Sequence, residues 1–172
     1  DLMHVLKDAL GDVNVIAEDL GFLTDGVRRL LHDSGFPGMK VIQFAFDSRE
    51  ESDYLPHNYE KNCVVYTGTH DNDTLCGWYK VLDPDDLKLS QKYMNNANTP
   101  KTQIHWDFIR LALASVANLC IIPLQDYLGL GSEARINTPS TLGNNWRWRM
   151  KSGCLTKAFA EQIKEMTKLY GR

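Results

Sequence analysis

Hydrophobic residues along this chain follow two kinds of spacing. Short, nearly continuous apolar runs are typical of β-strands that are buried on both faces. They occur at 13–17, 39–46, 63–67 and 119–124. Elsewhere apolar residues recur every three or four positions, which predicts amphipathic helices over 2–10, 24–34, 84–95, 101–118 and 156–170.

Residues at the predicted helix ends agree with these limits. Thr24, Thr156 and Asp83 precede helical spacing and are suited to accept a hydrogen bond from the first turn. Pro84 favours a first helical position, since it has no N–H to leave unpaired there. Gly35 follows the second helix, where a left-handed backbone conformation commonly ends a helix.

The alternation of strands and helices predicts an α/β fold with a parallel sheet. We expect a single domain over 1–172, with two long polar loops at 47–62 and 129–149. Right-handed β-α-β connections of this kind occur in a barrel or in an open doubly wound sheet. A complete (β/α)8 TIM barrel takes about 250 residues, so four strands predict half of one.

Composition excludes several classes of function. With a net charge of −3 and a pI near 5.9, we expect no nucleic-acid partner and no anionic membrane surface. No apolar run reaches the roughly 18 residues of a membrane span, and no signal peptide is evident. The four cysteines are scattered, so we expect free thiols, no metal site and a cytoplasmic location.

Candidate chemistry follows two of the predicted strands. Glu18 and Asp19 come directly after the run at 13–17, and His70, Asp71 and Asp73 follow the run at 63–67. In parallel α/β proteins, the loops after the carboxyl ends of strands hold the catalytic groups. We therefore expect Glu18 and Asp71 at the same edge of one sheet, as in paired-carboxylate chemistry.

Each of these features has an ordinary structural explanation. Glu18 and Asp19 are also compatible with solvated charge at a strand end, and 70–73 with a helix-capping turn or half of a divalent metal site. The aromatic residues Tyr66 and Trp78 are compatible with core packing. The run 146–149, Trp-Arg-Trp-Arg, is compatible with nucleic-acid stacking, although the acidic pI argues against it.

Taken together, several segments resemble a known family. Ile16–Gly21, Lys40–Phe46, Val65–Thr74, Asn137–Pro139 and Trp146–Arg149 occur in this order. The series is similar to the C-terminal half of 4-α-glucanotransferases (amylomaltase or disproportionating enzyme) of glycoside hydrolase family 77. The resemblance implies about strands five to eight of a TIM barrel. It also implies transfer of α-1,4-glucan segments between maltooligosaccharides by a retaining mechanism, with no cofactor.

The resemblance also implies roles for single residues. Glu18 would be the general acid/base, and Asp71 would stabilise the oxocarbenium-like transition state. Substrate-binding positions would be His70, Asp19, Asp47 and Asn137. Tyr66, Trp78, Trp146 and Trp148 offer rings on which glucose can stack.

The chain departs from the family in one respect. The family's nucleophile is an aspartate in an Arg-x-Asp-His-type motif, which this sequence does not contain. We therefore expect no activity from this chain alone, and we expect its open sheet edges to be covered by the missing N-terminal half or by a second copy. A plant source would imply a plastid location.

Two other functions remain open at this point. One is a noncatalytic carbohydrate-binding or assembly module on the same half-barrel. The other is a metal-dependent hydrolase that uses His70, Asp71, Asp73 and Glu18.

Overall fold

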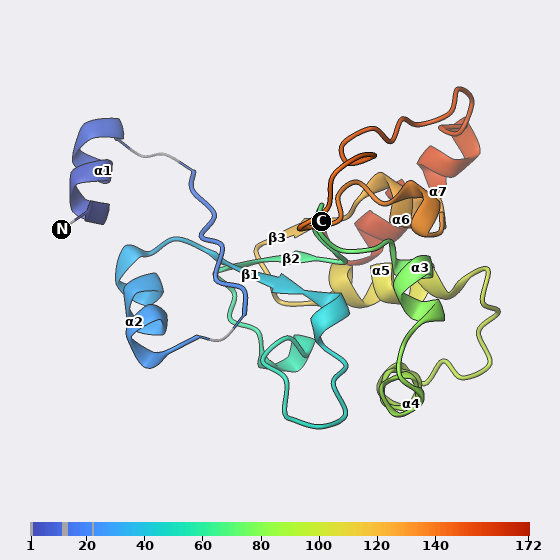
Figure 1. The fold of residues 1–172 in the computed structure, drawn as a ribbon, viewed down its shortest axis with the longest axis horizontal. Helices are drawn as coiled ribbons and strands as arrows, with labels where there is room; N and C mark the ends of the chain where they lie inside the picture. The colour runs from blue at the N-terminus through green and yellow to red at the C-terminus, as the bar shows by residue number, and fades with distance from the viewer. Residues whose placement is uncertain (1, 12–13, 22) are drawn as a thin grey trace.

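A computed structural model describes residues 2–11, 14–21 and 23–172 of the chain. In this part of the chain the sheet has three parallel strands in the order β1-β2-β3 (Figure 1). These are β1 (Gly38–Val41), β2 (Cys63–Tyr66) and β3 (Leu119–Ile121). Met39 pairs with Val64, and Val65 pairs with Cys120, so the central strand is β2.

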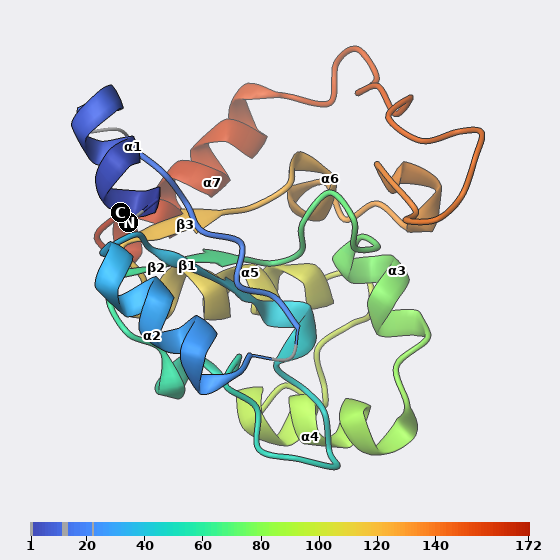
Figure 2. The ribbon, with the colours of Figure 1, turned by 60° about the vertical axis from the view of Figure 1, so that its left-hand side comes forward.

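Helices surround this small sheet. They are α1 (Leu2–Leu10), α2 (Asp25–Ser34), α3 (Leu75–Lys80), α4 (Pro84–Met94), α5 (Ile104–Ala114), α6 (Leu124–Tyr127) and α7 (Lys157–Leu169). Three 3₁₀ turns, η1 (Ile42–Phe44), η2 (Pro56–Asn58) and η3 (Ser132–Ala134), lie in the connections. Helices α1 and α2 lie at one end of the molecule and α3 and α4 at the other (Figures 1 and 2).

The core forms where α5 packs against β2 and the first turn of α3. Val65 of β2, Leu75 of α3 and Phe108 of α5 are fully buried. The Phe108 ring makes edge contacts with Trp78 and Tyr79, at centroid distances of 5.2 and 5.8 Å. Edge contacts of this kind between aromatic rings stabilise the core that α3, α5 and β2 share.

The capped helix ends predicted from the sequence are confirmed, whereas the helix predicted over 101–118 extends only over Ile104–Ala114. The Thr24 hydroxyl accepts the Val27 N–H, and the Thr156 hydroxyl accepts the Phe159 N–H at 3.1 Å. The Asp83 carboxylate accepts the Asp85 N–H at 2.9 Å, beside Pro84 in the first turn of α4. Gly35 ends α2 with a φ of 70°.

The strand predicted at 13–17 is wrong over 14–17, and Val13 lies outside the described residues. Ala17 N donates to Pro37 O at 2.9 Å, as a neighbouring strand would. The next donor on β1, Met39 N, is instead taken by the Asp19 carboxylate at 2.5 Å. A side chain thus replaces the backbone ladder, and Gly38 leaves it room, since a Cβ there would lie 2.7 Å from Asp19 Oδ2.

Other differences are smaller. The strand predicted at 39–46 ends at Val41, because the chain turns into η1. The strand predicted at 119–124 ends at Ile121, since Pro123 has no N–H for the ladder and precedes α6. It is also not buried on both faces as predicted, because Leu119 and Ile121 are exposed at this side of the sheet. The short helix α3 was not predicted. Among the described residues, no helix has both the length and the apolar character needed to cross a membrane.

The Arg172 side chain links the end of α5 to the chain that leads into β3. Its guanidinium donates to Leu113 O, Ser115 O and Ala117 O at 2.8, 2.8 and 2.9 Å. We expect Arg172→Ala to lower the free energy of unfolding by about 1–3 kcal/mol, because three carbonyls lose a charged donor. Urea denaturation measures this change. Arg110→Ala, which removes one exposed hydrogen bond to Tyr170, is the control, and equal midpoints for the two variants would contradict the prediction.

Candidate active site

A cavity of about 880 Å³ opens at the carboxyl ends of the three strands. Phe44, Gly68 and Pro123, which follow β1, β2 and β3, contribute to its wall. Glu18, His70 and Asp71 line the same cavity. The structure therefore brings together the two predicted catalytic carboxylates and one predicted sugar-binding residue.

Asp71 is held by two neighbours through one oxygen. Asn137 Nδ2 donates to Asp71 Oδ1 at 2.6 Å, and His70 Nε2 lies 3.2 Å from the same atom. The backbone repeats the link, since Asn137 N donates to His70 O at 3.1 Å. Both of these side-chain contacts are to Oδ1. The described residues make no hydrogen bond to Oδ2, which therefore remains available to a ligand in the cavity.

Trp146 extends this group outward. Its ring lies 5.1 Å from the His70 ring, tilted by 36°, and the residue is 58% exposed. Its backbone has a φ of 64°, a conformation that L-residues rarely adopt, and its N–H donates to Ile136 O at 2.7 Å. The loop from 136 to 146 is thus folded back so that the indole ring lies against His70 while more than half of Trp146 stays exposed to solvent.

Glu18 reaches the cavity from the segment beside β1. It is exposed, and its charge contributes to the raised pKa of the Tyr66 phenol, although burial is the larger cause. Tyr66 ends β2 and lines the same cavity. An exposed carboxylate and a partly buried phenol therefore line the same cavity.

A buried carboxylate lies behind the loop that carries His70 and Asp71. Asp126, in α6, is 2% exposed. Its Oδ2 accepts the Thr67 hydroxyl at 2.6 Å, and its Oδ1 accepts the Leu75 N–H at 2.8 Å. Thr67 and Leu75 stand at the two ends of the loop, so one side chain holds both ends.

Further side chains hold the interior of this loop. Gln43 Nε2 donates to Asp73 O at 2.7 Å, and Ser132 Oγ donates to Asp73 Oδ2 at 2.6 Å. Arg135 Nη2 donates to Asp71 O at 2.6 Å. Asp73 thereby anchors the loop and does not line the cavity with Asp71.

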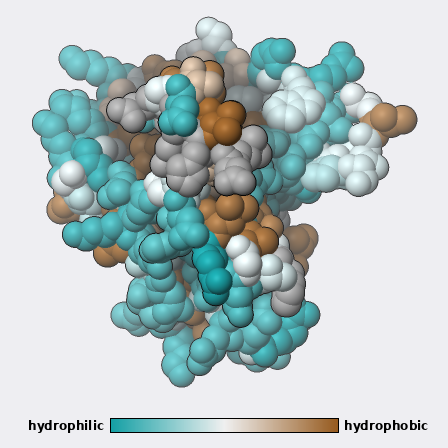
Figure 3. Space-filling model, turned by 90° about the vertical axis from the view of Figure 1, so that its left-hand side faces the viewer, coloured by the Kyte–Doolittle hydropathy of each residue, from teal (hydrophilic) through white to brown (hydrophobic). Residues whose placement is uncertain are grey.

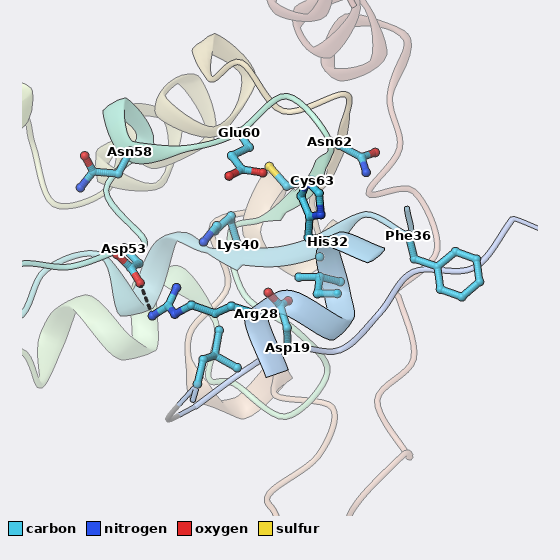
Figure 4. A pocket seen from close by; sticks show the side chains of 13 residues that line it. Asp19, Arg28, His32, Phe36, Lys40, Asp53, Asn58, Glu60, Asn62 and Cys63 are labelled. Atoms are coloured by element: carbon cyan, nitrogen blue, oxygen red, sulfur yellow. Dashed lines mark hydrogen bonds and ion pairs between the residues drawn. The ribbon is translucent and has the colours of Figure 1, made fainter. Parts of the chain in front are cut away.

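Two predicted substrate-binding residues lie elsewhere. Asp19 borders a second cavity, of about 500 Å³, together with Arg28, His32 and Lys40 (Figure 4). Asp47 pairs with Arg49 through Oδ1 and Oδ2 at 2.7 and 2.6 Å, which lowers the pKa of the Asp47 carboxyl to about 2. Neither residue belongs to the cavity of Glu18 and Asp71.

The aromatic candidates divide in the same way. Tyr66 lines the cavity, and Trp146 lies against His70. Trp78 packs on Phe108 in the core, and Trp148 is half-buried outside the cavity lining. Within the described residues, no group of three or more His, Cys, Asp or Glu side chains is placed to hold a metal ion.

Sequence reasoning missed the residues that hold the loop, which are Asp126, Arg135 and Gln43. Asp126 follows a predicted strand at 119–124 and is the first acidic residue after it, which is a signal of the kind used for Glu18 and Asp71. Arg135 lies two residues before Asn137, within reach of the same motif. Gln43 has no such signal, because it lies inside an apolar run.

Comparison with known proteins identifies the family of the chain. The family model described as 4-alpha-glucanotransferase matches residues 1–156. The chain belongs to this 4-alpha-glucanotransferase family. The family suggested by the sequence resemblance is therefore confirmed.

Relatives of known name agree with this assignment. The 4-alpha-glucanotransferase of Clostridium butyricum is 48% identical over 172 residues, which cover 99% of this chain and 35% of the relative. A chloroplastic/amyloplastic 4-alpha-glucanotransferase of Arabidopsis thaliana is 42% identical over 174 residues, 99% of this chain and 30% of the relative.

A solved structure shows the same fold. The amylomaltase of Streptococcus agalactiae in complex with acarbose superimposes with a TM-score of 0.91 at 38% identity, covering 99% of this chain and 34% of that one. The chain thus spans about a third of the length of the relatives that it matches.

The buried Asp126 makes the stability of the chain depend on pH. Burial raises the pKa of this carboxyl from 3.8 to about 6, with the Asp73 charge adding to the rise and the Thr67 and Leu75 hydrogen bonds opposing it. A raised carboxyl pKa favours the folded state at low pH, and this stabilisation is lost as the pH rises through about 6.

We therefore expect Asp126→Asn, relative to wild type, to gain on the order of 2–3 kcal/mol of unfolding free energy between about pH 3.5 and pH 7. The amide does not ionise, and it can accept from Leu75 and donate to the Thr67 hydroxyl. Urea denaturation across this pH range measures the difference. The exposed Asp85→Asn is the control, and parallel pH profiles for Asp126→Asn and wild type would contradict the prediction.

Proposed function

We propose that residues 1–172 form about strands five to eight of a 4-α-glucanotransferase barrel and supply its acid/base and its transition-state stabiliser. The observation that supports this most directly is that Glu18, His70 and Asp71 line a single cavity at the carboxyl ends of parallel strands. Active sites of (β/α)8 barrels lie at this end of the sheet. In this proposal the chain acts as one domain.

The chemistry assigns a step to each group. Glu18 gives a proton to the glycosidic oxygen as the bond to the leaving glucan breaks, and it later takes the proton of the acceptor sugar hydroxyl. Asp71 offers negative charge to the oxocarbenium-like sugar through Oδ2, while Asn137 and His70 hold its Oδ1. His70 and the open face of Trp146 bind the sugar ring beside the broken bond.

A retaining transfer also needs a carboxylate nucleophile. The motif that carries it in the family is absent from this sequence, and two nearby candidates are engaged in other contacts. Asp19 accepts the Met39 N–H, and Asp73 accepts Ser132 and the Thr74 N–H at 2.8 Å. We therefore propose that the chain is inactive until the nucleophile comes from the part of the enzyme that it does not include.

The sides of the sheet support a larger assembly. Ile16, beside β1, is 39% exposed, and Leu119 and Ile121 of β3 are 47% and 37% exposed. Hydrophobic residues are also exposed on the end of the molecule that carries α1 and α2 (Figure 3). Apolar positions at the two sides of an open parallel sheet are suited to further strands and helices.

We expect residues 1–172 alone to associate or to bind a dye specific for exposed apolar surface, because these sides have no cover. Light scattering over a dilution series, together with dye fluorescence, tests this expectation. Adding the N-terminal part of the Clostridium butyricum relative should abolish dye binding and give a one-to-one complex. A monomer with a cooperative melt and no dye binding would contradict the prediction.

Activity is tested by joining the N-terminal part of the Clostridium butyricum relative to residues 1–172. We expect this chimera to disproportionate maltooligosaccharides, and residues 1–172 alone to show no transfer. Glu18→Gln and Asp71→Asn should each lower kcat about 10⁴-fold, because catalytic groups that act as a unit lose most of the rate together. The exposed pairs on α7 and α4 supply matched controls, Glu161→Gln and Asp85→Asn, which should leave kcat unchanged.

An inactive but folded chimera would refute the catalytic proposal. Binding of maltooligosaccharides to that chimera, measured by calorimetry, would then favour the noncatalytic carbohydrate-binding alternative. Robust transfer by residues 1–172 alone would assign the nucleophile to a carboxylate of this chain, with Asp19 and Asp73 the first to substitute.

The cytoplasmic location inferred from the sequence stays a prediction, and a plastid location is expected if the source is a plant.

A further inference from the structure

The loop that carries His70 and Asp71 begins and ends on the same buried group. Thr67, the residue after β2, and Leu75, the first residue of α3, both donate to the Asp126 carboxylate, at 2.6 and 2.8 Å. We name residues 67–75 the β2–α3 loop. Its two ends are thereby fixed to α6, which follows β3, more than fifty residues further along the chain.

Asp126 does more than begin helix α3. That helix already has an N-cap, because the Thr74 hydroxyl accepts the Gly77 N–H at 3.1 Å. The second hydrogen bond of Asp126 goes to Thr67, which lies before the loop and outside the helix. A carboxylate kept only for helix capping would not need this second partner.

Burial makes the contact sensitive to small changes. Asp126 and Thr67 are 2% and 0% exposed, so water does not compete for their hydrogen bond. Burying a carboxylate costs free energy unless hydrogen bonds compensate for its lost hydration. Asp126 is therefore favoured only where it accepts from both the Thr67 hydroxyl and the Leu75 N–H. The position of the β2–α3 loop is therefore coupled to that of α6.

We propose that Asp126 is a positioning residue that sets where His70 and Asp71 stand in the cavity. It does not line that cavity, so it acts through the β2–α3 loop. The inference rests on the proposed function for its catalytic consequence, although its structural consequence stands by itself. Asp71 Oδ2 and Glu18 act on the two sides of one sugar bond, and a displacement of about 1 Å can cost about 100-fold in rate.

Substitutions separate the two ends of the contact. Thr67→Val keeps the branched shape and removes the hydroxyl, which frees the β2 end of the loop. Thr67→Ser restores the hydroxyl. Asp126→Ala frees both ends, whereas Asp126→Asn can accept from Leu75 and donate to Thr67, so it keeps both.

In the chimera, we expect kcat to fall about 10-fold for Thr67→Val and about 100-fold for Asp126→Ala, with KM changed less than threefold. Thr67→Ser and Asp126→Asn should retain kcat within about threefold. Ile109→Val, a core change in α5 outside the loop, controls for loss of stability and should leave kcat unchanged. If the role of Asp126 were merely structural, kcat would fall in proportion to the loss of unfolding free energy in every variant. Ile109→Val would then lose kcat as much as a Thr67→Val variant of equal stability.

A second measurement does not depend on activity. In residues 1–172, amide hydrogen exchange should become at least 10-fold faster over 68–75 in Thr67→Val, while β2 and α5 keep their wild-type rates. Ile109→Val should instead accelerate exchange in α5.

The outcomes separate the two proposals. If the wild-type chimera is inactive, the proposed function fails, and exchange over 68–75 decides the role of Asp126. If the chimera is active and Thr67→Val and Asp126→Ala keep wild-type kcat, the positioning role is overturned while the proposed function stands. Faster exchange spread evenly over the whole chain in Thr67→Val would also overturn the positioning role. If Asp126→Ala does not fold, kcat and hydrogen exchange of Thr67→Val decide the question.

Discussion

The arrangement of the candidate site depends on the two hydrogen bonds that Asp126 accepts in the interior. Thr67 and Leu75 are both buried, so the carboxylate has no alternative partner in water. Burial makes ionisation of this carboxyl less favourable than in water and so raises its pKa. This unfavourable free energy arises at the two ends of the β2–α3 loop, where Asp126 accepts from Thr67 and Leu75.

The contacts that follow form a sequence from the interior to the surface. The β2–α3 loop fixes Asp71, and the Asp71 region in turn fixes the segment after η3 through Arg135 and Asn137. That segment then brings Trp146 against His70. Residues near 70 and near 140 therefore depend on each other, so a change in one loop is expected to alter the other.

The packing of the chain is uneven in a way that fits a part of a larger enzyme. Around Phe108 the core is dense and rich in aromatic contacts, whereas the residues beside β1 and on β3 leave apolar side chains exposed. The candidate stabiliser Asp71 follows the well-packed strand β2, whereas the candidate acid Glu18 lies on the exposed segment beside β1. Under our proposal, the missing nucleophile and the missing cover for the sheet come from the same source.

The sequence by itself determined the family, the capped helix ends, the central strand β2, and the placement of Glu18, His70 and Asp71 after strand-like runs. These follow from local signals, because capping residues and strand-end carboxylates are recognisable within a few positions. Tertiary structure decided the rest. Asp19 took the place of a backbone ladder on Met39, which ended the expected first strand, and Asp47 paired with its neighbour Arg49 away from the cavity. Asp126 carries the same strand-end signal as Glu18 and Asp71, but its role could not be identified beforehand, because its partners Thr67 and Leu75 lie 59 and 51 residues away.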